Sequence, residues 1–172
     1  RHLLVTGAAT GRRAFYHLNP EHAQSDANVE ICNGGDTEIY GLKSEGLFCV
    51  LWLRNATGVK LYGYGGNACP CSEYPAGFAQ FKPSLFRVED STDIDLVSLT
   101  SYEMGGTLAQ DTTSLKGVNM PGCTGSRCKC LAPDQWLSVL EVTLHSNITS
   151  RILDRPVLWR RTAAGRPLKS DD

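Results

Sequence analysis

Apolar and polar residues alternate with a period of two along most of the chain, which is the pattern of half-buried β-strands. A continuous apolar run at residues 47–53 predicts a strand that is buried on both faces. Turn residues such as Asn33-Gly34-Gly35-Asp36 separate the segments, and we expect 47–53 and 59–64 to pair as a hairpin. The alternating segments predict strands at residues 29–32, 37–42, 59–64, 78–81, 84–88, 93–102, 138–145 and 155–160.

Many short strands with little helical periodicity predict a mostly-β protein, an antiparallel β-sandwich or barrel whose loops are stapled by disulfides. We expect a single domain over residues 1–162, or two small β units divided near 87–92, and a polar, disordered tail over 163–172. One short helix is expected after Asn19-Pro20, and a helix from Pro133 competes with the strand at 138–145. No internal repeat of fixed period is evident.

The charges balance, with 17 basic and 18 acidic residues and a net charge of −1. This composition argues against a nucleic-acid partner that would be bound through a broad basic face. No uninterrupted apolar run is long enough for a membrane span. We therefore expect a monomer with a protein or carbohydrate target, without nucleic acid and without a membrane span.

Seven cysteines are the most informative feature of the composition, because they indicate a secreted chain with two or three disulfides and one unpaired thiol. A Cys32–Cys49 bridge would staple two strands. Zinc bound by the later cysteines is the alternative that we favour less, since Cys-x-Cys spacing is unusual for zinc. The sequons at Asn55 and Asn147 predict glycosylation in the same compartment. The cysteines are Cys32, Cys49, Cys69, Cys71, Cys123, Cys128 and Cys130.

No catalytic motif, metal site or cofactor signature is evident, so we expect no catalytic residues, no metal and no cofactor. Tyr62, Tyr64 and Tyr74 flank a glycine-rich stretch and are the candidate binding residues, because tyrosine combines apolar area with a polar tip. The alternative is a small secreted hydrolase that uses Asp93, Asp95 or His145 as acid–base groups.

Clustered cysteines, short β-segments and the lack of a catalytic signature give the chain a general similarity to secreted, cysteine-rich fungal effector or toxin-like proteins. This resemblance implies a non-catalytic virulence protein that recognises a host target through surface loops. It concerns the style of the whole chain, and no functional residue is carried over from it.

Overall fold

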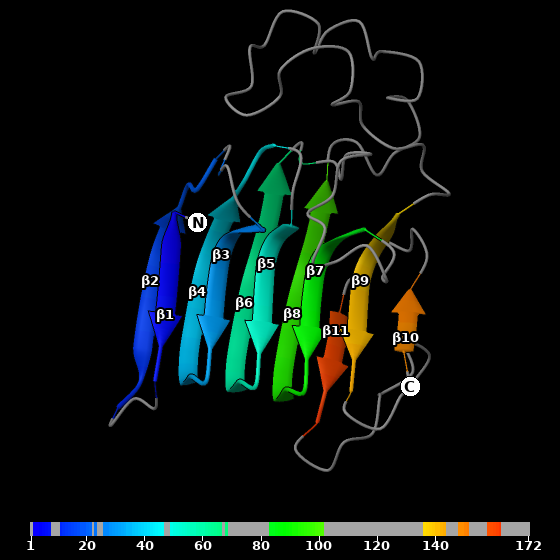
Figure 1. Ribbon diagram of the computed structural model, residues 1–172. Coiled ribbons are helices and arrows are strands. Elements are labelled where there is room, and N and C mark those ends of the chain that lie inside the picture. The colour runs from blue at the N-terminus through cyan, green and yellow to red at the C-terminus, as the bar shows by residue number, and fades with distance from the viewer. Residues whose placement is uncertain are drawn as a thin grey trace, which may run out of the picture.

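The strands alternate along the sequence between two sheets, as the computed structural model in Figure 1 shows. The structure describes residues 2–7, 11–21, 23, 26–46, 49–66, 68, 83–101, 136–143, 148–151 and 158–162. Sheet A contains, in spatial order, β1 (Leu3–Thr6), β3 (Ala27–Cys32), β5 (Cys49–Arg54), β7 (Ser84–Glu89), β9 (Leu137–Val142) and β10 (Ile148–Arg151). Sheet B contains β11 (Leu158–Arg161), β8 (Thr92–Ser101), β6 (Thr57–Gly66), β4 (Gly35–Lys43) and β2 (Arg13–Leu18).

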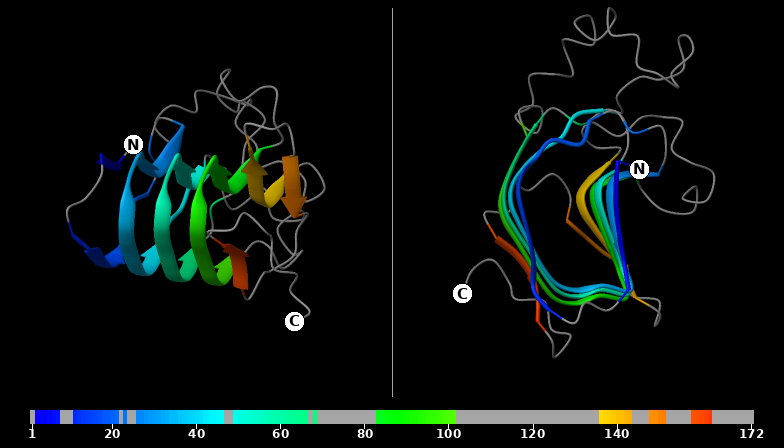
Figure 2. Two further views of the ribbon diagram at one scale, coloured as in Figure 1. Left: turned by 90° about the horizontal axis from the view of Figure 1, so that it is seen from below. Right: turned by 90° about the vertical axis from the view of Figure 1, so that its left-hand side faces the viewer.

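Neighbouring strands run parallel in both sheets from β1 to β9. Each of the first four strands of sheet A is followed in the chain by a strand of sheet B, and we call such a pair a rung: β1–β2, β3–β4, β5–β6 and β7–β8. Figure 2 shows the strands of successive rungs overlying one another around a shared interior. The architecture is therefore a two-sheet parallel solenoid, in which each rung pairs with the rungs before and after it.

The predicted antiparallel, disulfide-stapled sandwich or barrel is wrong, because among the strands that the structure describes only β10 and β11 pair with their neighbours in the antiparallel sense. Strands β3 to β9 and β11 lie close to predicted ranges, whereas β2 and β10 were not predicted. The predicted strand at 78–81 lies outside the described residues. The expected hairpin is not formed, because β5 pairs with β3 and β7 in sheet A, whereas β6 pairs with β4 and β8 in sheet B. Asn55 has φ 47° but Ala56 does not have a positive φ, and the chain turns a corner from sheet A into sheet B.

This corner repeats in successive rungs. Asn33, Asn55 and Asp90 each follow a strand of sheet A and have φ values of 52°, 47° and 44°. Asparagine and aspartate tolerate this left-handed conformation better than other residues with a side chain. Backbone amides continue the ladder around the corner: the N–H of Asn33 donates to the carbonyl of Arg54 over 2.9 Å, and that of Asn55 to the carbonyl of Glu89 over 2.9 Å.

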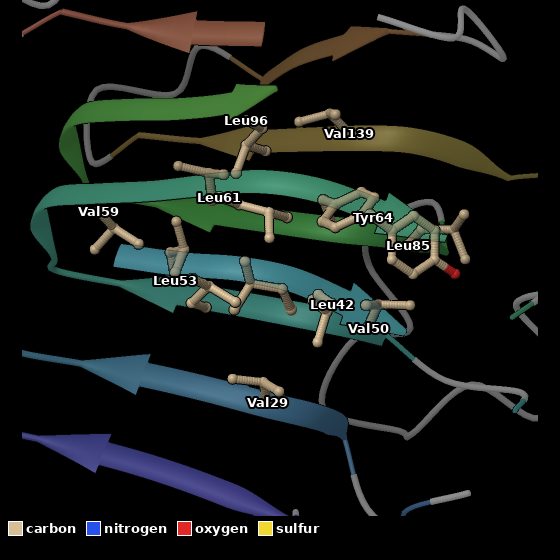
Figure 3. Close-up of a cluster of buried hydrophobic side chains, with 14 of the residues drawn as sticks. Val29, Leu42, Val50, Leu53, Val59, Leu61, Tyr64, Leu85, Leu96 and Val139 are labelled. Atoms are coloured by element: carbon tan, nitrogen blue, oxygen red, sulfur yellow. The ribbon is translucent and has the colours of Figure 1, made fainter. Parts of the chain in front are cut away.

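The core lies between the two sheets, where side chains of both sheets meet (Figure 3). Tyr64 of β6 packs edge-on against Phe86 of β7, with ring centroids 5.1 Å apart. Five of the residues that the sequence places in the core belong to this cluster: Val50, Leu61, Leu96, Leu99 and Trp159. Trp52 and Leu140, also expected there, are buried outside the cluster, and Val142 is only partly buried.

The expected short helix is absent at its place. Phe15 to Leu18 belong to strand β2, and residues 19–21 and 23 are not helical. The competing helix over 138–145 is also wrong where the structure describes it, because residues 137–142 form β9. The suggested division near 87–92 falls inside the fourth rung, where the chain passes from β7 to β8. The predicted tail, 163–172, lies outside the described residues.

The two described cysteines do not form the Cys32–Cys49 bridge. In the parallel pair β3–β5, Cys49 stands opposite Ala27, whereas Cys32 stands opposite Arg54. Five residues of strand separate the two levels, or about 16 Å, while a disulfide needs Cα atoms within about 7 Å. Cys32 and Cys49 are buried free thiols. The other five cysteines lie outside the described residues.

Candidate functional site

A column of backbone kinks crosses sheet B at right angles to its strands. His17, Gly41, Gly63 and Ser98 occupy equivalent places in four successive rungs, and their φ values are 53°, 75°, 85° and 54°. In each rung the residue after the kink, such as Leu42 or Leu99, is directed back into the core. Two consecutive residues therefore face outward before the kinked strand resumes its alternation.

An open groove of about 640 Å³ follows this column across the four rungs. This size falls within the usual range of ligand-binding pockets. The two kinked glycines have no side chain, and a Cβ at Gly63 would meet no atom within 4 Å. The imidazole of His17 lies beside Gly41, with Nδ1 3.5 Å from the place of a Cβ there. The lining residues are His17, Leu18, Asn19, Gly41, Leu42, Lys43, Gly63, Tyr64, Gly65 and Ser98.

A row of three stacked tyrosines lies on sheet B next to the column of kinks, although these tyrosines are not among the residues that line the groove. Tyr16, Tyr40 and Tyr62 directly precede the kinked residues of the first three rungs and are in register with one another. The ring centroids of Tyr16 and Tyr40 are 5.1 Å apart, and those of Tyr40 and Tyr62 are 5.0 Å apart. The rings are nearly parallel, at 9° and 19°. Because the rings face one another, the row presents ring edges and hydroxyl groups outward.

The charged residues beside the tyrosine row compensate one another. Glu38, Lys60, Asp95 and Arg160 are in register on four neighbouring strands and alternate in sign. Arg160 forms an ion pair with Asp95, and Arg12 with Glu38. The hydroxyl of Tyr40 donates to Glu38, and this bond together with Arg12 holds the pKa of Glu38 below its ordinary value. The row therefore carries little net charge.

The single cation among the lining residues, Lys43, is also compensated. Its ammonium group is bound by Glu21 and lies 2.7 Å from the carboxylate of Glu45. The hydrogen bond with Glu21 contributes most to raising the pKa of Lys43. The described lining of the groove thus offers apolar and hydroxyl surface with balanced charge, and the tyrosine row lies beside it. This combination suits an uncharged ligand better than an ionic one.

A buried polar network supports the corner next to the groove. The amide of Asn28 donates to the hydroxyl of Ser44 over 2.6 Å, and that hydroxyl donates to the carbonyl of Pro20 over 2.7 Å. The hydroxyl of Tyr64 donates to the carbonyl of Ser44 over 3.3 Å. These bonds fix the chain where sheet B ends, because buried polar groups are costly to leave unpaired.

The three tyrosines predicted as binding residues differ in location and exposure. Tyr62 belongs to the outward row and its exposed fraction is 36%. Tyr64 lies along the groove but is only 1% exposed, because its ring packs in the core. Tyr74 lies outside the described residues. Two residues that the sequence reasoning missed, Tyr16 and Tyr40, complete the row.

The acid–base candidates are not assembled into one site among the described residues. Asp95 faces the guanidinium group of Arg160, and Asp93 lies two residues earlier in β8 with φ 53°. His145 lies outside the described residues.

On the outer face of sheet A, Glu30 binds Arg54 over 2.8 Å, and the guanidinium carbon of Arg54 lies 4.8 Å from the ring centre of Trp52. This second cluster is a charge-compensated ladder, which stabilises the sheet.

The modification candidates are only partly described. Asn55 is exposed at its corner, where its Nδ2 donates to Oδ1 of Asn33 over 2.8 Å. Glycosylation of Asn55 stays a prediction, and Asn147 lies outside the described residues.

Burial raises the pKa of the Cys49 thiol to about 12, and the thiol donates to the carbonyls of Leu51 and Leu85 over 3.2 Å each. Cys49 is therefore an inert core residue.

Within the described part of the chain there is no cluster of three or more metal-ligating side chains. The same part contains no helix with the length and apolar character needed to cross a membrane. Comparison with protein families, with curated proteins and with solved structures finds no match for this chain.

Proposed function

We propose that this protein is a non-catalytic recognition protein that binds an extended carbohydrate chain in the groove of sheet B. The observation that supports this proposal most directly is the groove itself, which crosses four rungs beside the tyrosine row. A ligand that lies across the rungs meets a similar surface in each rung. Such a repeating surface fits a polymer better than a compact small molecule.

The chemistry of the groove favours a carbohydrate among polymers. Sugar rings have apolar C–H edges and many hydroxyl groups, and tyrosine edges and hydroxyls complement both. A nucleic acid would need cations free to bind phosphate. In the groove Lys43 already binds Glu21 and Glu45. An extended peptide usually gains its affinity from backbone hydrogen bonds at a sheet edge, whereas this groove lies on a sheet face.

Secretion and an effector-like role stay predictions from the sequence. In such a protein the groove would be the site that binds the target. A protein that holds a cell-wall or cell-surface polysaccharide needs no acid–base pair. The hydrolase alternative loses support from geometry, since the carboxylate of Asp95 faces Arg160. An ion-paired carboxylate is a poor general acid, because the neighbouring cation favours its ionised form.

A steric block of the groove tests the proposal. Gly65 lies in the groove, and a Cβ there would meet no atom within 4 Å, so Gly65→Phe fills the groove without crowding the fold. Gly11 is equally open but lies outside the groove, so Gly11→Phe is the matched control. Binding is measured by co-sedimentation with insoluble cellulose, chitin and β-1,3-glucan.

We expect the unsubstituted chain and Gly11→Phe to co-sediment with at least one polysaccharide, and Gly65→Phe to lose at least about tenfold in affinity, or about 1.4 kcal/mol. Equal melting temperatures of the two variants exclude unfolding as the cause. If no polysaccharide binds, or if Gly65→Phe binds as well as the control, the proposed function is wrong.

A further inference from the structure

The spacing of the rungs sets a scale along the groove. Neighbouring strands in a sheet lie about 4.8 Å apart. The tyrosine rings keep this repeat, with centroids 5.1 and 5.0 Å apart. A fully extended β-1,4-linked pyranose chain advances by nearly the same distance with each sugar. The groove and such a chain are therefore commensurate over several residues.

Each of the first three rungs offers the same local surface. A tyrosine edge is followed by a kinked residue with positive φ, in the order Tyr16-His17, Tyr40-Gly41 and Tyr62-Gly63. The fourth rung keeps the kink at Ser98 but has Val97 in place of the tyrosine. The groove thus has three similar positions and a fourth, weaker one.

The ligand is expected to be uncharged. The partly buried charges beside the positions alternate in sign from strand to strand, and Lys43 is compensated by two glutamates. A polyuronate would find no row of free cations in the described groove, and its carboxylates would approach Glu38 and Asp95. Screening by salt should consequently have little effect on affinity.

We propose that the groove binds a neutral β-1,4-linked pyranose chain with one sugar in each rung, which gives four consecutive subsites. This inference rests on the proposed function and adds the ligand class and its register. Tyr16 forms the outer end of the series, because β2 is the edge strand of sheet B and Tyr16 is 65% exposed. The other end lies at Ser98.

Isothermal titration calorimetry with β-1,4-linked glucose and N-acetylglucosamine oligomers of increasing length tests the register. We expect the association constant to rise by about 2- to 12-fold for each sugar up to the third, the range expected for one aromatic contact, and by less for the fourth, which meets Val97 instead of a tyrosine. Further sugars should add less than about twofold, since they find no further subsite. Affinity should change little between low salt and about 1 M salt.

A variant with one blocked subsite tests the register independently. In Gly65→Phe the third rung is obstructed, so the rise should end at two sugars, whereas Gly11→Phe should keep the plateau at four. If oligomers bind without this length dependence, or if an oligogalacturonate binds more tightly, the register and ligand class are wrong while carbohydrate binding stands. If insoluble polysaccharides and oligomers all fail to bind, the proposed function is wrong as well.

Discussion

Two adjacent glycines at the end of β6 have opposite steric surroundings. Gly65 faces open space in the groove, where a Cβ would meet no atom within 4 Å. A Cβ at Gly66 would instead collide with the backbone carbonyl of Ser44. Since Ser44 is held by Pro20 and Asn28, it has little freedom to move away.

We therefore predict that Gly66→Ala destabilises the fold by about 1–3 kcal/mol, the usual cost of overpacking. Gly65→Ala, one residue earlier, should change stability by less than about 0.5 kcal/mol. Urea denaturation with both variants measures the difference through the midpoint at a common slope. Equal midpoints for the two variants would contradict this prediction, because they would show that the backbone at Ser44 moves aside despite its hydrogen bonds.

At the scale of elements, the last strand, β11, contributes one residue of a buried ion pair in the core. Arg161 of β11 is opposite Ile94 and directed inward, where it binds Glu141 of β9 through two hydrogen bonds. The side chains of Arg161 and Glu141 are only 7% and 3% exposed. The pair connects sheet B to sheet A where the parallel stacking ends.

A double-mutant cycle should reveal this connection. Glu141→Leu or Arg161→Met alone leaves an uncompensated buried charge and should cost about 3–5 kcal/mol. The double variant should recover most of that loss, because removal of a buried pair by apolar residues is often neutral. Chemical denaturation of the four proteins gives the coupling energy. Additive losses would contradict a direct pairing between the two sheets.

The sequence identified most strands but not how they pair. Alternation located β3, β4 and β6 to β9, and a continuous apolar run located β5. Neither pattern carries information about which strand lies alongside. The corner at Asn55-Ala56 resembles a hairpin turn in sequence, and only the pairing of β5 and β6 with strands of different sheets separates the two outcomes. Cross-strand registers such as Tyr16–Tyr40–Tyr62 arise from this stacking, so the tyrosine row could not be derived without it.

A repeat signal was nevertheless present. Each of the first three rungs contains a tyrosine, a kinked residue and a residue directed inward: Tyr16-His17-Leu18, Tyr40-Gly41-Leu42 and Tyr62-Gly63-Tyr64. Asn33-Gly34, Asn55-Ala56 and Asp90-Ser91 mark the opposite corner. The connections between sheet B and the next strand of sheet A differ greatly in length, which hides any fixed period. A search for recurring corners would have found the solenoid.

For the whole molecule, the stacking implies that stability depends on neighbouring rungs. The first rung has a neighbour on one side only, because β1 and β2 are the edge strands of their sheets. Its inward side chains Leu3, Phe15 and Leu18 are only partly buried. In the second rung, Ile39 and Leu42 are 0% and 1% exposed.

We predict that this 172-residue chain opens from the first rung. Hydrogen exchange followed by mass spectrometry should show faster exchange in peptides covering β1 and β2 than in those covering β5 and β6, because end rungs unfold locally at lower free energy. Leu18 and Leu42 occupy equivalent positions in adjacent rungs and form a matched pair. Leu42→Ala should cost about 2–5 kcal/mol, and Leu18→Ala clearly less. Equal protection of the first and third rungs, together with equal losses at these two leucines, would mean that the stack unfolds as one cooperative unit.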